Sequence, residues 1–407
     1  MGFSLSDIDI KHVLILFGTP ALAIYGIINV PLQQQTALWA LAYYFWSGLG
    51  ITAGYHRYWS HRSYDATLLW QWIMMAAGSS AMEGSIKWWS RGHRVHHRFT
   101  DTPKDPYNAK YGFFWSHMGW MIMKQGRLAT VDVSDLSVDW LVRFQHKHYP
   151  LISVFMAFGV PTLVAGLGWG DWLGGFFFAG VARLVFVHHA TFCVNSLAHY
   201  IGDYTFDDKR TPKDHFLTAL ITCGEGYHNF HHEFPADYRN AIKVYQYDPT
   251  KWLIWFASLV GLAYNLKCFP QNEIEKGRIM MLEKEIADEK QKLNGKPVPS
   301  RIVALEQDIQ ASKKKLNYGV PVEELPSLTV YEVKQEIERT GKQLLIISGV
   351  VYDVTKFIDD HPGGKGFMKA AIGRDVTSSF NGEVYDHANA ARNLMASMRY
   401  ARVQGPK

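Results

Sequence analysis

Four uncharged apolar runs limit what this chain can fold into more than any other feature of its sequence. Each is close to the roughly 20 residues that a helix needs to cross a bilayer. They form two pairs, at residues 13–30 and 36–54 and at residues 151–170 and 172–192. Because backbone polar groups inside a bilayer must be paired within the protein, the runs predict a multi-pass α-helical membrane protein with four transmembrane helices and a cytosolic helical domain.

The distribution of charge predicts how these helices are oriented. Residues 56–150, between the two pairs, hold twelve Lys and Arg residues, whereas the two short connectors hold none. The positive-inside rule therefore places this loop and both termini in the cytosol. The start of the chain has no basic n-region or small-residue cleavage site, so no removable signal peptide is expected. Gly2 and Ser6 fit a myristoylation pattern, although four spans make a lipid anchor redundant.

Composition excludes several other classes of protein. The 42 Lys and Arg residues against 37 Asp and Glu residues leave a net charge of +5, too small to favour nucleic acid as a partner. Three scattered cysteines do not support a disulfide framework or a thiolate zinc site. Two shorter apolar stretches, 68–82 and 252–265, predict helices at the membrane interface or packed on the cytosolic domain. Arg183, inside the fourth run, is expected either to pair structurally or to meet a substrate headgroup.

The composition changes after residue 270. Residues 271–320 contain eighteen charged residues of alternating sign, which predicts a solvated helical linker interrupted near Gly295 and Pro297. Beyond it, apolar runs such as LLIISGVVYDV and short helical patterns indicate a small α+β domain. The predicted organisation is a membrane domain at 1–270, a charged helical linker at 271–322 and an α+β domain at 323–407.

Histidines are grouped in the predicted cytosolic segments. Spacings of three and four residues put side chains on one helix face, so each group can present its imidazoles to one point. Nine imidazoles are too many for one ion, since zinc sites typically use four ligands, and two metals are therefore predicted. The groups are His56 and His61; His93, His96 and His97; Asn195 with His199; and His228, His231 and His232.

The ligand types favour one metal chemistry over others. A single His-x-x-His-His group has a structural explanation as good as a functional one, but three groups ordered around four spans do not. Glu225-x-x-His228 is one half of the pair that soluble di-iron bundles use, and no second copy exists. The zinc-protease pattern His-Glu-x-x-His is absent as well. Imidazole-rich coordination suits iron with open positions for dioxygen, and a membrane location suggests a lipid substrate.

Five strings resemble those of membrane acyl-CoA Δ9 desaturases, over roughly residues 35–250: GITAGYHRYWSH, KWWSRGHRVHH, DPYNAKYGFFWSHMGW, FCVNSLAH and GEGYHNFHHEFP. The resemblance implies that the nine histidines, with Asn195 acting through water, bind two irons, so that the cytosolic helical domain is a di-iron domain. It implies O₂-dependent insertion of a cis double bond between carbons 9 and 10 of a saturated acyl-CoA, usually stearoyl-CoA or palmitoyl-CoA, at the endoplasmic reticulum membrane. Front-end desaturases carry Gln where this chain has His228, and this difference argues against that class.

The same resemblance implies a bent apolar tunnel for the acyl chain. Trp89 and Thr191 would flank the bend, and Tyr44 would lie near the methyl end. Residues 82–85, which precede the second histidine group, resemble the fungal members of the desaturase family more than the animal members. The candidates for binding CoA phosphates are three basic residues of the large loop, namely Arg91, Arg143 and Lys147.

The C-terminal domain resembles cytochrome b5. His361 begins a His-Pro-Gly-Gly string preceded by VVYDVTKFIDD, and DHANAARNLM supplies His387, two residues further along than is usual in that family. Two axial imidazoles leave haem iron no position for oxygen and suit one-electron transfer. The acidic residues around these ligands are candidates for docking a reductase: Asp359, Asp360, Glu383 and Asp386.

The two resemblances are complementary. Reducing O₂ to two waters needs two electrons beyond the two substrate hydrogens, and a tethered b-type haem would deliver them from NADH through cytochrome b5 reductase. Two other functions stay open. A histidine-motif lipid hydroxylase or sterol oxidase would leave a hydroxyl group on its product. A membrane-anchored electron carrier would show no oxygen consumption driven by acyl-CoA.

Overall fold

The computed structural model describes residues 5–404, which form two compact units. One unit comprises Met1–Asp203 and Arg210–Cys268, and the other comprises Tyr204–Lys209 and Phe269–Lys407. Gly2, the candidate myristoylation site, lies outside the described residues. The first unit contains all the histidine groups of the predicted metal centre, and the second contains His361 and His387.

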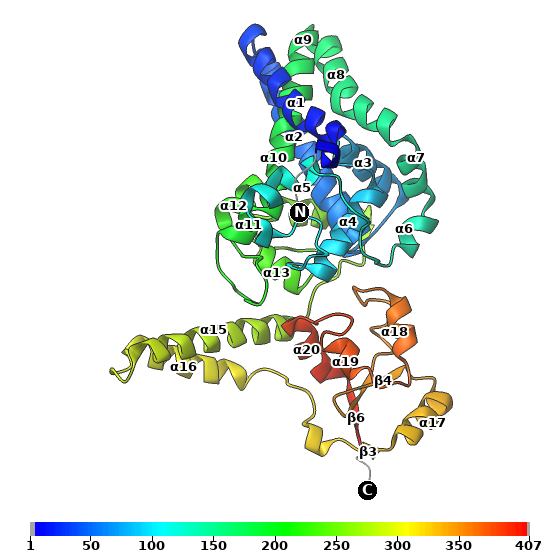
Figure 1. Ribbon diagram of the computed structural model, residues 1–407, viewed down its shortest axis with the longest axis vertical. Helices are drawn as coiled ribbons and strands as arrows, with labels where there is room; N and C mark the ends of the chain where they lie inside the picture. Colours follow the sequence, from blue (N-terminus) through cyan, green and yellow to red (C-terminus); the bar gives the residue numbers. More distant parts are fainter. Residues whose placement is uncertain (1–4, 405–407) are drawn as a thin grey trace. The chain divides into compact units, whose positions relative to one another are not determined.

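The first unit is helical (Figure 1). Its only strands among the described residues are the short pair β1 (Asp65–Ala66) and β2 (Ala263–Tyr264). Its longer helices are α1 (Ile10–Asn29), α2 (Gln34–Leu49), α3 (Leu68–Ser79), α4 (Ile86–Phe99), α7 (Trp140–Val154), α8 (Val160–Trp169), α10 (Arg183–Asn195) and α14 (Pro249–Leu259). Shorter helices complete it, namely α5 (Trp120–Ile122), α6 (Ser134–Val138), α9 (Trp172–Gly174), α11 (Leu197–Tyr200), α12 (Phe216–Ile221) and α13 (His228–Glu233).

Three helical segments among residues 5–404 are long and apolar enough to cross a membrane: Ile10–Asn29, Trp140–Trp169 and Trp172–Tyr200. They contain the first, third and fourth predicted spans. The second predicted span, 36–54, lies on α2 and its helical continuation but is not among these three segments. Tryptophan, tyrosine, serine and glycine make this helix less apolar than the other three.

Four stretches of the first unit are π-helical, at Gly50–Ser60, Trp115–Gly119, Phe155–Gly159 and Gly175–Ala182. Hydrogen bonds in a π-helix join residues five apart, and such stretches are frequent at functional sites. The first stretch continues α2 directly and is almost wholly buried. It carries His56 toward the centre of the unit.

Close approach of two helices fixes the position of this π-helical stretch. A Cβ atom at Gly50 would lie 2.2 Å from the backbone nitrogen of Gly78, on α3. A Cβ atom at Gly78 would lie 2.4 Å from the ring of Tyr55. Only glycine at both positions permits this contact between backbones, because any side chain would occupy space that the neighbouring helix fills.

Arg183 has a structural role in this fold. Its guanidinium donates to the carbonyl oxygens of Ala157 at 2.7 Å and Ser80 at 2.8 Å and to the hydroxyl of Ser47 at 3.2 Å. The side chain is buried and ties three helical segments together. Of the two explanations open from the sequence, structural pairing is the one that these contacts support.

The two shorter apolar stretches form α3 and α14. Each helix buries one side in the unit, with Met74 and Ile254 in the core. Each also leaves large apolar side chains exposed, such as Leu69 and Phe256, which are both 60% exposed. They therefore pack on the unit and keep an apolar face free for the membrane interface.

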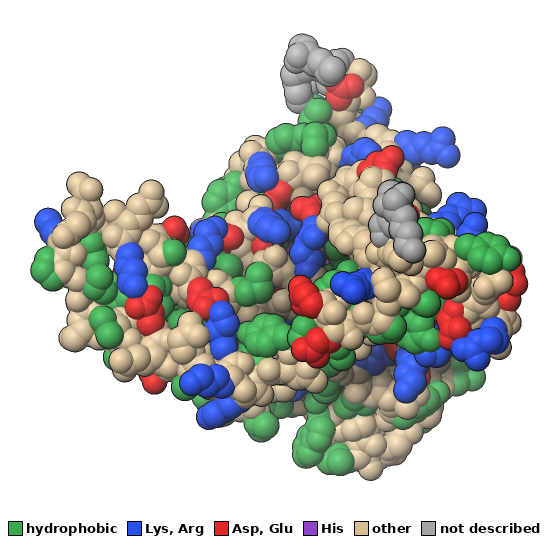
Figure 2. All heavy atoms as spheres, turned by 90° about the horizontal axis from the view of Figure 1, so that it is seen from below, with side chains coloured by type: hydrophobic (Ala, Val, Ile, Leu, Met, Phe, Trp, Pro, Cys, Tyr) green, Lys and Arg blue, Asp and Glu red, His purple; other side chains and the backbone are tan. Residues whose placement is uncertain are grey.

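The predicted linker forms two helices that pack on each other, α15 (Gln271–Leu293) and α16 (Ser300–Lys313). Its helical character and its interruption at 294–299 match the expectation, but it is not solvated on all sides. Four isoleucines form an apolar seam between the helices, namely Ile279, Ile286, Ile302 and Ile309. Charged side chains cover the outer faces, where Lys290 pairs with Glu306 at 2.6 Å. Figure 2 shows the same mixture of basic and acidic side chains over one face of the molecule.

The remainder of the second unit is the expected α+β domain. Its four-stranded sheet has the order β3-β6-β5-β4. The strands are β3 (Ser327–Leu328), β4 (Leu344–Ile347), β5 (Val350–Asp353) and β6 (Arg399–Val403). Ser348 and Gly349 both have positive φ, as the tight β4–β5 turn requires. The helices are α17 (Val330–Thr340), α18 (Lys365–Ala371), α19 (Thr377–Phe380) and α20 (Asn389–Met395).

Gly50→Ala tests the helix contact that positions the π-helical stretch. The added methyl group would meet backbone atoms, so we expect a loss of about 1–3 kcal/mol in stability, measured by thermal unfolding in detergent. Gly18→Ala on α1 is the control, because a Cβ atom there meets nothing within 4 Å. Equal melting temperatures for the two variants would contradict this account of the contact.

Candidate metal centre and its pocket

The structure brings the nine histidines of the sequence motifs together in two groups. The ring nitrogens that face each other lie within 4.8 Å of one another in each group. The larger group comprises His56, His61, His93, His97 and His231. The smaller group comprises His96, His199, His228 and His232. The two groups do not follow the sequence motifs, because α4 and α13 each contribute histidines to both groups.

Separations between Nε2 atoms fit metal coordination. They are 2.9 Å for His56 and His231, 2.8 Å for His61 and His93, and 3.2 Å for His96 and His232. Two ligands at right angles, each about 2.1 Å from one ion, are about 3.0 Å apart. The Nε2 atom of His199 is buried and has no hydrogen-bond partner in the described part of the chain. An inward nitrogen without a partner is what a metal ligand shows when no ion is present.

Local structure explains how each motif presents its rings. His56 and His61 are five residues apart, a spacing that an α-helix would turn to different faces. The backbone N–H of His61 donates to the carbonyl of His56 at 3.1 Å, which is the π-helical pattern, and both rings therefore face the same side. On α4, His93 and His97 are four residues apart and point to one group.

The outer nitrogens of three rings are held by hydrogen bonds. His56 Nδ1 lies 3.0 Å from a carboxylate oxygen of Glu225, and His96 Nδ1 lies 2.9 Å from Asp105. His199 Nδ1 lies 2.7 Å from the hydroxyl of Thr211. A proton placed on Nδ1 by such a partner leaves the Nε2 lone pair free to bind a metal.

Electrostatics keep several of these histidine rings neutral and keep one neighbouring carboxylate ionised. Burial and the neighbouring imidazoles hold the pKa of His61, His97 and His231 well below the usual value, so these rings are neutral. Burial alone would raise the pKa of Glu225, but the Arg57 guanidinium and His56 outweigh it and lower this pKa to about 2. Glu225 is therefore an ionised carboxylate.

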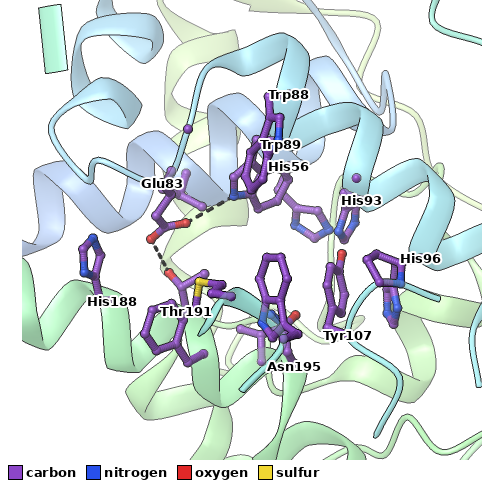
Figure 3. A pocket seen from close by; sticks show the side chains of 18 of the residues that line it. His56, Glu83, Trp88, Trp89, His93, His96, Tyr107, His188, Thr191 and Asn195 are labelled. Atoms are coloured by element: carbon purple, nitrogen blue, oxygen red, sulfur yellow. Dashed lines mark hydrogen bonds between the residues drawn. The ribbon is translucent and has the colours of Figure 1, made fainter. Parts of the chain in front are cut away.

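A cavity of about 860 Å³ adjoins the histidines. Figure 3 shows it between α4 and α10, with His56, His93 and His96 at one side. Trp89, Thr191 and Asn195 line it, as does Tyr44, whose hydroxyl donates to the carbonyl of Ile221 at 3.0 Å. All four residues named from the desaturase resemblance therefore reach the same cavity. The ring of Trp89 also stacks on His93, at 5.0 Å between centroids.

Glu83 joins two walls of this cavity and was missed by the sequence analysis. Its carboxylate accepts hydrogen bonds from Thr191 at 2.8 Å and from the indole N–H of Trp89 at 3.2 Å (Figure 3). Burial raises the pKa of Glu83 to about 7, although these two donors act in the opposite direction. The available signal was a single acid in an apolar stretch, MMAAGSSAMEGS, where an unpaired carboxylate would be costly.

Basic residues lie along one part of the cavity, and only one of them was named from the sequence. Arg91 lines the cavity together with Lys87 and Arg127. Lys87 is four residues before Arg91 on α4, so helical spacing could have indicated it. Within residues 5–404, Arg143 and Lys147 are not among the lining residues and are exposed on α7. A role for these two in binding CoA stays a prediction.

In the second unit, His361 and His387 face each other across a gap that fits a haem. Their ring centroids are 6.3 Å apart. Two axial imidazoles on one iron would place their centroids about 6 Å apart, because each metal–nitrogen bond is about 2 Å and each centroid lies about 1 Å beyond its nitrogen. The Nδ1 atom of each ring lies near a backbone carbonyl, that of Gly364 at 3.3 Å and that of Phe380 at 3.0 Å. Burial lowers the pKa of His361 to about 4, so this ring is neutral.

Glu83→Gln should change how stability depends on pH. The pKa of Glu83 is about 7 in the folded protein against 4.5 in the unfolded chain. The folded protein keeps a proton that the unfolded chain releases over this range, so the wild type loses stability as pH rises through it, by up to about 3 kcal/mol. The melting temperature of the variant minus that of the wild type should therefore increase with pH up to about pH 7 and then stay level. Parallel melting curves across this range would contradict the raised pKa.

Comparison with known proteins identifies the family. Residues 35–265 match the model described as "Fatty acid desaturase", and residues 329–404 match "Cytochrome b5-like Heme/Steroid binding domain". The chain is 46% identical to "Acyl-CoA desaturase 1" of Saccharomyces cerevisiae over 402 residues, which cover 97% of this chain and 74% of that protein. It is 40% identical to "Stearoyl-CoA desaturase" of Homo sapiens over 252 residues, which cover 60% of this chain and 70% of that protein. It is 40% identical to "Delta(9)-fatty-acid desaturase fat-6" of Caenorhabditis elegans over 243 residues, which cover 58% of this chain and 71% of that protein. The chain therefore belongs to the fatty acid desaturase family and carries a cytochrome b5-like domain at its C-terminal end.

Proposed function

We propose that this protein is an acyl-CoA Δ9 desaturase, which uses O₂ and two electrons to insert a cis double bond between carbons 9 and 10 of stearoyl-CoA or palmitoyl-CoA. One observation carries the proposal: the two histidine groups border a cavity that contains both apolar and basic side chains. Apolar lining suits an acyl chain, and basic residues suit the phosphates of CoA. The names of the relatives describe the same chemistry.

The histidine groups would hold two irons, one in each group, with Asn195 acting through water at the smaller one. The irons supply the activation of O₂ when they are bound. The chain's own residues would hold the ligands in place and position the substrate beside them. His361 and His387 would hold a b-type haem as the electron donor.

The cavity suggests how the acyl-CoA lies. Trp89 and Thr191, held together by Glu83, would form the bend of the chain. Tyr44, which bonds to the end of α12, would limit the methyl end. The CoA phosphates would lie near Lys87, Arg91 and Arg127, and the exposed Arg143 and Lys147 would add charge further out. This arrangement would put carbons 9 and 10 near the histidines, since Trp89 at the proposed bend stacks on His93.

The proposed setting is the membrane of the endoplasmic reticulum, with four transmembrane helices and with both termini and the catalytic domain in the cytosol. The three apolar segments would supply three of the spans, and α2 with the start of its π-helical continuation would supply the fourth. A fourth span is needed for both termini to be cytosolic, since an odd number would leave them on opposite sides. The histidines carried by the π-helical stretch would then lie at the cytosolic surface.

The second unit would deliver the electrons. We infer three parts: a membrane domain at 1–270, a helical linker at 271–322 and a haem domain at 323–407. The haem would be reduced by NADH-cytochrome b5 reductase, for which the acidic residues around His361 and His387 offer a docking face. A covalent tether keeps the donor at high effective concentration beside its acceptor.

The two alternative functions fit less well. The function of a membrane-anchored electron carrier does not explain a cavity that is lined by both basic residues and histidines. A lipid hydroxylase would share the cavity and the metal chemistry, and it is separated from a desaturase by its product.

Expression in cells that lack their own desaturase tests the function. The wild type should restore fatty acids with a double bond at carbon 9, and His231→Ala should abolish this while the protein still inserts, because apolar helices and not metals drive insertion. His148→Ala is the matched control, since His148 is exposed on α7 outside both groups. Hydroxylated products would favour the hydroxylase, and full activity in His231→Ala would overturn the metal assignment.

His361→Ala tests the electron route. The variant should lose the b-type absorption bands and retain the irons of the histidine groups. Turnover with NADH and reductase should fall strongly, and added free cytochrome b5 should restore part of it, because only the donor is missing. Undiminished turnover of the variant, with no other cytochrome present, would falsify the donor role of this domain.

A further inference from the structure

Each histidine group has its own buried carboxylate. Glu225 contacts His56, a member of the five-histidine group, and Asp105 contacts His96, a member of the four-histidine group. Both carboxylate side chains are almost fully buried, at 3% and 1% exposure. The ligand groups themselves contain imidazoles alone, so these carboxylates are negative charges placed directly behind the rings.

Glu225 is held at the first group by Arg57 and His56. One oxygen of Glu225 accepts from Arg57 at 2.9 Å, and the other lies 3.0 Å from His56. Arg57 is itself buried and is paired a second time, with Asp248 at 2.9 Å. Arg57 therefore holds Glu225 in place while it also pairs with a second carboxylate.

Asp105 is held in a different way at the second group. It accepts from His96 Nδ1 and, besides this ring, from the backbone N–H groups of Asp101 at 3.1 Å and Tyr107 at 3.2 Å. The turn after α4 therefore fixes this carboxylate, whereas the loop before α13 and the π-helical stretch fix Glu225. The two carboxylates have separate supports and share no partner in these contacts.

A divalent ion surrounded by neutral imidazoles in a buried site has an uncompensated charge, which is unfavourable unless an anion lies nearby. A carboxylate hydrogen-bonded to the outer nitrogen of a ligand also fixes the ring and raises its basicity, and loss of such a partner typically weakens metal binding about 10- to 100-fold. Since each group has one such partner, the effect of its loss should stay within that group.

We propose that Glu225 and Asp105 are positioning residues that each secure one of two irons, so that loss of either carboxylate empties one histidine group and leaves the other filled. This inference rests on the proposed two-iron centre and adds that the two irons are held independently. It concerns metal occupancy, which can be measured without turnover.

The test uses the purified full chain reconstituted with ferrous iron. Non-haem iron is the total iron minus the haem iron, and haem is measured separately from its absorption. The wild type should hold two non-haem irons, and fewer would overturn the two-iron centre itself. Glu225→Gln and Asp105→Asn should each hold about one, with about 10- to 100-fold weaker binding at the affected group. The double variant should hold none.

Mössbauer spectra then identify which iron is left. The iron remaining in Glu225→Gln is bound by four histidines and that in Asp105→Asn by five, so the two single variants should show different spectra that together account for the spectrum of the wild type. Identical spectra, loss of both irons in either single variant, or two irons with unchanged affinity in both would overturn the proposal.

Asp237→Asn is the matched control, because Asp237 is also buried and pairs with an arginine, Arg239, at 2.8 Å. It belongs to neither histidine group, and this variant should keep both irons. If Glu225→Gln does not fold, Glu225→Asp gives the same readout, since the shorter side chain keeps the charge but withdraws the oxygen from His56.

Discussion

The first unit depends on one constraint, the convergence of the inner nitrogens of nine imidazoles, all of them buried except the half-buried His61 and His97. Nε2 atoms only 2.8–3.2 Å apart cannot all find hydrogen-bond donors, and a buried nitrogen without a partner costs free energy. An ion in each group would satisfy these nitrogens at once, which couples metal binding to the stability of this region. The buried carboxylates, the Arg57 network and Thr211 all serve to aim the rings inward.

Irregular helices make this convergence compatible with a membrane. Three segments are long and apolar enough to cross a bilayer. A plain α-helix at the end of α2 would not turn His56 and His61 to the same side. The π-helical stretch after α2 does so, and the glycine contact with α3 holds it in place. One continuous helical segment, 34–60, thus leads from the apolar bundle directly into the histidine centre.

The cavity connects this centre to the rest of the proposed chemistry. Trp89 touches both His93 and the carboxyl of Glu83, so the shape of the acyl site and the position of the metal site share a side chain. Basic residues on α4 and on the segment after α5 then lie along the same cavity. In the second unit, two histidines with anchored outer nitrogens face each other at 6.3 Å between ring centroids. If both bound one haem, they would leave its iron no position for oxygen, so this site would transfer electrons only.

The sequence by itself determined the family, the nature of the C-terminal domain, three of the apolar spans and the identity of all nine histidines, because hydropathy and helical spacing are local properties. It did not reveal how the histidines divide into five and four, nor that Glu83, Lys87 and Arg127 belong to the cavity. It named Arg143 and Lys147 as CoA contacts, and these lie outside the cavity lining among the described residues. Only the tertiary structure decided these points, since His231 meets His56 across 175 residues of chain. Spacing along a sequence tells which side chains share a helix face, whereas the packing of distant elements decides which faces meet.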